Sequence, residues 1–139
     1  MDSSLNRPTN EHLRSSWMTF LAGLCALTLV VSIVRDLFLP ASRGTEVWFG
    51  FEVHGMAAML TAPIHWAIFA TGAWAFWNAK PWAAPAAAGY MFYAALAHLV
   101  WSEASPHGRG IAIGMVQAAA ISTIGLLILR AHRGHAARR

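Results

Sequence analysis

Two histidines that could carry chemistry lie inside long apolar stretches of this chain. His54 follows the apolar residues that begin at Val47, and His98 lies four residues before Ser102, where another apolar stretch ends. The hydrocarbon core of a membrane is unfavourable for an ionisable side chain, so residues placed there are candidates for function. If the two stretches run antiparallel, both imidazoles reach a similar depth and could ligate a metal or a haem iron.

More ionisable side chains are expected on the same side of the membrane as this pair: Glu46, Glu52, Glu103 and His107. Imidazoles and carboxylates together can hold zinc, copper or iron. They can also relay protons or support a haem as hydrogen-bond partners of its ligands. The sequence leaves these possibilities open.

A polar stripe is predicted along the second apolar stretch. His54, Thr61 and His65 are spaced by 7 and 4 residues, which places them on one helical face. His54 and His65 are too far apart to bind the same atom, and His65 alone is expected to donate to a backbone carbonyl of a neighbouring helix. His98 shares a face with Met91 and with alanines, a surface open enough for a flat cofactor.

The elements that must position these residues follow from composition. The chain has 139 residues, of which 57% are hydrophobic and only 12% charged. A membrane-spanning helix needs roughly 20 apolar residues, and four stretches meet that requirement. We therefore predict a single-domain, all-α, integral membrane four-helix bundle. Its helices are expected at about 17–39, 47–77, 82–102 and 110–130, with a basic C-terminal tail at 131–139.

The cations are distributed unevenly between the two predicted sides of the membrane. The side with both termini and the 78–81 loop carries Arg7, Arg14, Lys80, Arg130, Arg133, Arg138 and Arg139, whereas the other carries only Arg35, Arg43 and Arg109. The positive-inside rule therefore places both termini in the cytoplasm of a bacterial-type inner (plasma) membrane. The basic tail suits contact with anionic lipid. No folded basic surface accompanies it, so no nucleic-acid partner is expected.

Several residues and motifs together resemble a known family. His54 comes soon after Trp48 and is followed by a Gly-Met-Ala-Ala run, and the turn 105–110 reads Ser-Pro-His-Gly-Arg-Gly, with Gly114 beyond it. In these features the chain is similar to styrene oxide isomerase and its relatives, the hydroxylaminobenzene mutases, which are small four-helix membrane proteins. The similarity covers the second to fourth helices, and the first only by hydropathy.

The resemblance implies a homotrimer that binds haem b between neighbouring subunits, with His54 as the axial iron ligand. Ferric iron would act as a Lewis acid on an epoxide oxygen, giving a carbonyl product by a Meinwald-type rearrangement of a small hydrophobic substrate taken from the membrane. The chain has Leu60 and Leu99 where the family has a pocket asparagine and a tyrosine. Thr61 and His98 could replace them as catalytic residues.

The remaining site residues are expected around the same pocket. Met91 and Trp101 are predicted beside the cofactor, and Tyr90 and Tyr93, together with Trp101, along the substrate. If His98 instead took the second axial position on the iron, the protein would be a small b-type cytochrome or a metal-binding membrane subunit. A third possibility is a non-enzymatic accessory subunit of a membrane complex.

Overall fold

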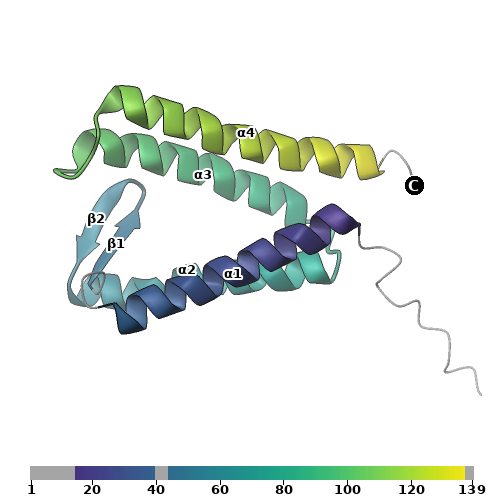
Figure 1. The fold of residues 1–139 in the computed structure, drawn as a ribbon, viewed down its shortest axis with the longest axis horizontal. Helices are drawn as coiled ribbons and strands as arrows, with labels where there is room; N and C mark the ends of the chain where they lie inside the picture. Colours follow the sequence, from purple (N-terminus) through teal and green to yellow (C-terminus); the bar gives the residue numbers. More distant parts are fainter. Residues whose placement is uncertain (1–14, 40–43, 137–139) are drawn as a thin grey trace, which may run out of the picture.

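The computed structural model describes residues 15–39 and 44–136 (Figure 1). It contains four helices, α1 (Ser16–Phe38), α2 (Met56–Trp77), α3 (Ala83–Ala104) and α4 (Ile111–Ala136), and two short strands between α1 and α2. All four helices are long and apolar enough to cross a membrane, which confirms that part of the prediction. Some residues used for the charge count, and the end of the predicted tail, lie outside the described residues: Arg7, Arg14, Arg43, Arg138 and Arg139.

The second helix does not begin at Val47 as predicted, because residues 45–54 form an antiparallel hairpin. Strands β1 (Thr45–Trp48) and β2 (Phe51–His54) pair in register around the turn Phe49-Gly50. Both turn residues have positive φ, 53° and 86°, as a tight two-residue hairpin turn requires. The fold is therefore mostly helical with one small sheet, and not purely α-helical as expected.

This hairpin also breaks the predicted polar stripe. His54 ends β2, and α2 begins at Met56 after Gly55, whose φ of 64° and ψ of −137° suit glycine and few other residues. His54 therefore lies outside the helix that carries Thr61 and His65. The spacing of 7 residues between His54 and Thr61 gives no information about a shared helical face here.

The helices associate as two antiparallel pairs, α1 with α2 and α3 with α4. The pairs meet near the turn that joins α2 to α3 and diverge towards the opposite end, where the hairpin stands between them (Figure 1). Small side chains dominate the core where the pairs meet. Its buried members are Met18, Ala22, Ala75, Phe76, Ala83, Ala84, Ala88 and Ile128.

Glycines allow α3 and α4 to approach closely. A Cβ atom on Gly114 would lie 2.8 Å from Cβ of Ser102, and one on Gly125 would lie 3.2 Å from Cβ of Met91. Small residues at such contacts are how apolar helices gain packing energy in a membrane, where helix association has no hydrophobic driving force.

The hairpin turn is held against α3. The Phe49 amide donates a hydrogen bond to the Tyr93 hydroxyl at 3.1 Å, and the two rings meet edge to face with centroids 5.3 Å apart. A Cβ atom on Gly50 would lie 2.6 Å from Cγ1 of Val100 and 2.7 Å from the carbonyl oxygen of Ala97. Gly50 therefore serves both the turn geometry and the close contact with α3.

Candidate functional site

The hairpin presents one carboxylate on each of its two faces. Cross-strand partners share a face, and successive residues alternate. Because Val47 pairs with Glu52 and Trp48 with Phe51, Glu52 lies on one face and Glu46 on the other. Each carboxylate is the centre of a polar group of residues, which we name the Glu52 cluster and the Glu46 cluster.

The Glu46 cluster links α1, the hairpin and α2. The Glu46 side chain is buried, with 6% of its surface exposed. One carboxylate oxygen accepts a hydrogen bond from Arg35 Nη2 at 2.8 Å, and the other lies 2.9 Å from Nδ1 of His65. The His65 ring stacks on Trp48 with centroids 4.2 Å apart and an interplanar angle of 11°. These contacts hold the imidazole in a fixed orientation.

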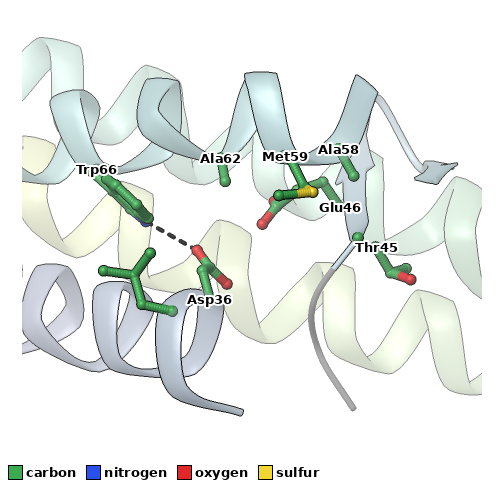
Figure 2. Close-up of a pocket in the computed structure, with 9 residues that line it drawn as sticks. Asp36, Thr45, Glu46, Ala58, Met59, Ala62 and Trp66 are labelled. Carbon is green, nitrogen blue, oxygen red and sulfur yellow. Dashed lines mark hydrogen bonds between the residues drawn. The ribbon is translucent and has the colours of Figure 1, made fainter. Parts of the chain in front are cut away.

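Asp36 extends this cluster along α1. Its carboxylate pairs with Nε of Arg35 at 2.6 Å and accepts a hydrogen bond from the Trp66 indole at 2.9 Å. Figure 2 shows this bond at the edge of a cavity of about 240 Å³, which we call the α1–α2 cavity. Glu46 contributes to the wall of this cavity, together with small side chains of α2.

The Glu52 cluster links the hairpin to the turn between α3 and α4. One Glu52 oxygen accepts hydrogen bonds from the Ser105 hydroxyl and from the Trp101 indole, the latter at 2.9 Å, and lies 3.4 Å from Nδ1 of His107. The bonds from Ser105 and Trp101 lower the pKa of the Glu52 carboxyl, since they stabilise its charged form.

His54, the predicted iron ligand, lies at the edge of the Glu52 cluster. Its Nε2 is 3.5 Å from Glu52 and its Nδ1 is 3.4 Å from the Thr45 hydroxyl, while 63% of its side chain is exposed. These contacts are long for hydrogen bonds, so they hold the ring only weakly, and the exposed ring is accessible from outside this chain.

His98 lies with His65, and not with His54, on a second cavity. This cavity has a volume of about 300 Å³ and is bounded by the hairpin, α2 and α3; we call it the hairpin–α3 cavity. Its walls are Val47, His65, Tyr90, Tyr93, Ala94, Ala97, His98 and Trp101. The predicted substrate residues Tyr90, Tyr93 and Trp101 therefore do meet around one space.

The other two predicted site residues lie elsewhere. The Thr61 hydroxyl donates to the carbonyl of Ala57 at 2.9 Å and lies 3.2 Å from that of Ala58, bonds within its own helix. Met91 lines an apolar cavity of about 370 Å³ near the end where the helix pairs meet, so it does not share the hairpin–α3 cavity with Trp101.

The expected metal-binding cluster of imidazoles and carboxylates is not formed. Within residues 15–39 and 44–136, no three His, Cys, Asp or Glu side chains come together in a way that could hold a metal ion. Glu103, one of its expected members, lies exposed on α3. The carboxylates instead accept hydrogen bonds from arginine, serine, indole and imidazole groups.

The pairing of Glu46 with His65 is the feature that sequence reasoning missed. The expectation that His65 bonds a backbone carbonyl of a neighbouring helix is wrong, because its Nδ1 contacts a carboxylate from the hairpin. The available signal was Gly50 between two short runs rich in β-branched and aromatic residues, of which Phe51–His54 alternates apolar and polar side chains. It predicts a hairpin, and hence opposite faces for the two glutamates.

Comparison of the chain with protein-family models, with curated proteins and with solved structures gives no match.

Proposed function

We propose that the four helices span a bacterial-type inner membrane with both termini in the cytoplasm. The hairpin then lies near the outer surface. The length and hydropathy of the helices support this proposal, as does the excess of Lys and Arg on the side opposite the hairpin. The Glu46 and Glu52 clusters would lie at the outer boundary, where water is within reach of charged side chains.

Within that membrane, we propose that the protein is a haem b-dependent isomerase that converts an epoxide to a carbonyl compound. The observation that carries the proposal is the position of His54, an exposed imidazole beside Thr45 and Glu52. A haem brings four nitrogen ligands of its own and needs only one from the protein. A single accessible imidazole suits that requirement, whereas a metal held by side chains alone would need a group of ligands that the described residues lack.

The surroundings of His54 also suit a haem at a subunit interface. The first turns of α2, which follow His54 directly, expose Met56, Met59 and Leu60 by 72%, 60% and 71%. These side chains offer an apolar surface for a porphyrin, and His54 lines none of the three cavities described above. A neighbouring subunit would have to cover the other side, in agreement with the proposed homotrimer.

The chain's own groups would hold and orient the reactants. One His54 ring nitrogen would bind the iron and give up its long contact, and the neighbour at the other nitrogen would orient the ring. When bound, ferric haem supplies a Lewis acid for an epoxide oxygen. A small hydrophobic substrate would enter from the bilayer. The catalytic roles of Thr61 and His98 stay predictions: Thr61 retains lone pairs on its hydroxyl oxygen, and His98 faces a different cavity.

The absorption spectrum of the protein, purified in mild detergent after expression with a haem precursor, tests this proposal. We expect a Soret band that is lost in His54→Ala and kept in His107→Ala. His107 is a matched control, because it is also exposed and also contacts Glu52. Absence of the band from the unaltered protein would refute haem binding.

Two further outcomes separate the parts of the proposal. A low-spin band that both His54→Ala and His98→Ala remove would indicate a bis-histidine cytochrome in place of an isomerase. The loaded protein should also convert styrene oxide to phenylacetaldehyde. A Soret band with the expected His54 dependence but without this conversion would contradict the isomerase activity and leave the haem site intact.

A further inference from the structure

The hairpin–α3 cavity is separate from His54, which is not among the residues that line it. Two imidazoles line it from different helices, His65 on α2 and His98 on α3. At about 300 Å³ it has a volume at the lower end of the range of small-molecule sites. Its shape and chemistry can therefore be used to infer the class of ligand.

The Glu46 contact decides which nitrogen of His65 can accept a hydrogen bond. A carboxylate paired with a guanidinium can only accept, so Nδ1 of neutral His65, 2.9 Å from Glu46, must carry the ring proton. Nε2 then has the free lone pair. Glu46 also lines the α1–α2 cavity, so the Glu46–His65 pair separates the two cavities, with Nε2 as the nitrogen left for a molecule in the hairpin–α3 cavity.

The other walls favour an aromatic ring. Trp101 donates its indole N–H to Glu52, and the Tyr93 hydroxyl accepts a hydrogen bond from the Phe49 amide while keeping its own O–H as a donor, so both side chains are anchored to the hairpin. Their ring surfaces remain for the cavity, beside Tyr90 and the alanines of α3. Aromatic rings gain from edge and offset contacts with such walls.

We propose that the hairpin–α3 cavity binds a small aromatic molecule that bears a hydroxyl group. The hydroxyl donates its hydrogen bond to Nε2 of His65, and the ring lies among Tyr90, Tyr93 and Trp101. Glu46 is a positioning residue, which acts by fixing the tautomer and orientation of His65. This site needs no haem and stands if His54 binds no iron.

A pair of probes that differ only in the hydroxyl tests the proposal: 2-naphthol and naphthalene. Binding to the full chain in detergent, without haem, is followed by quenching of tryptophan fluorescence. The two probes partition differently into micelles, so the comparison is the ratio of their affinities in each variant. A neutral hydrogen bond of about 1 kcal/mol corresponds to a preference of roughly fivefold for 2-naphthol in the unaltered protein.

In His65→Leu we expect this preference to disappear while naphthalene still binds. His132→Leu, on α4 and away from the cavity, should leave the ratio unchanged. Ala97→Leu should abolish binding of both probes, since Ala97 lines the cavity and makes no part of the Glu46 cluster. Far-UV circular dichroism verifies that each variant is folded.

The tautomer is measured directly by ¹⁵N NMR of the imidazole nitrogens. We expect His65 to be protonated at Nδ1, and this preference to weaken in Glu46→Gln, an effect that a merely structural role of Glu46 would not produce. The proposal is overturned by an unchanged affinity ratio in His65→Leu or by the absence of saturable quenching with either probe. Protonation of His65 at Nε2 also overturns it. If His65→Leu does not fold, Ala97→Leu and the NMR measurement still decide.

Discussion

Replacement of Gly50 by alanine should detach the hairpin turn from α3. Gly50 has a φ of 86°, and an added Cβ would lie 2.6 Å from Cγ1 of Val100 and 2.7 Å from the carbonyl oxygen of Ala97. Both neighbours belong to a helix, so the hairpin is the part that must move. Movement would break the hydrogen bond and the edge-to-face contact between Phe49 and Tyr93.

The expected loss of stability follows from these contacts. The hydrogen bond is worth about 1 kcal/mol and the aromatic pair about 1 kcal/mol. The left-handed backbone adds about 1–2 kcal/mol for any residue with a Cβ. We therefore expect Gly50→Ala to lower the free energy of unfolding by about 3–4 kcal/mol. The matched control is Gly110→Ala. Gly110 has a φ of 81°, but among the described residues no further atom lies within 4 Å of its added Cβ, so this variant should lose only the backbone contribution of about 1–2 kcal/mol.

Equilibrium unfolding in mixed micelles, with a rising mole fraction of sodium dodecyl sulphate, measures the difference. Far-UV circular dichroism follows the helices, and tryptophan fluorescence follows all seven tryptophans, of which Trp48 lies in the hairpin and Trp101 contacts it. We expect the two alanine variants to differ by about 2 kcal/mol. Equal losses in both variants would refute the close contact between the hairpin turn and α3.

Further predictions concern helix packing and the two carboxylates. Gly114→Val should separate α3 from α4 and destabilise the protein by about 2 kcal/mol. Gly23→Ala should not destabilise it, because no further atom of the described residues lies within 4 Å of its added Cβ. Equal effects of the two substitutions in the same unfolding assay would contradict the close packing of α3 and α4. Glu46→Leu removes the partner of the largely buried His65 Nδ1 and should cost about 2 kcal/mol, against less than about 0.5 kcal/mol for Glu103→Leu at an exposed position. The folded-state pKa of Glu52 lies below its unfolded value, so its stabilisation is complete above the unfolded pKa and is lost as the pH falls through the folded pKa. The unfolding midpoint should therefore fall on acidification, and Glu52→Gln should reduce this dependence; the same pH profile in both proteins would contradict it.

The sequence predicts the positions of the helices better than it predicts which helices pack against each other. Four apolar stretches of sufficient length are visible without a structure, and the structure contains four such helices. Which helix packs on which is much harder to predict, because these helices are apolar on nearly every side. A stripe of apolar residues identifies a buried face only when the other faces are polar.

The candidate site depends on the hairpin, which hydropathy does not predict. Residues 47–54 continue an apolar stretch and were interpreted as helix, so His54 and His65 were expected on one helical face. In the hairpin, however, alternation separates Glu46 from Glu52, and only this separation brings His65 to Glu46. The contacts of Trp101 with Glu52 and of His98 with the hairpin–α3 cavity depend on the same register, which no spacing within a helix could reveal.

Because side chains alternate between the two faces of the hairpin, it matters whether a strand gains or loses an odd or an even number of residues. Deletion of Val47 would shift Thr45 and Glu46 by one position relative to β2, which exchanges the faces on which they lie. Both carboxylates would then stand on the same face, and Arg35 and His65 would lose their common partner. Removal of a cross-strand pair, one residue from each strand, would shorten the hairpin evenly. The hairpin should therefore tolerate the loss of one residue from a single strand far less well than the loss of one residue from each strand.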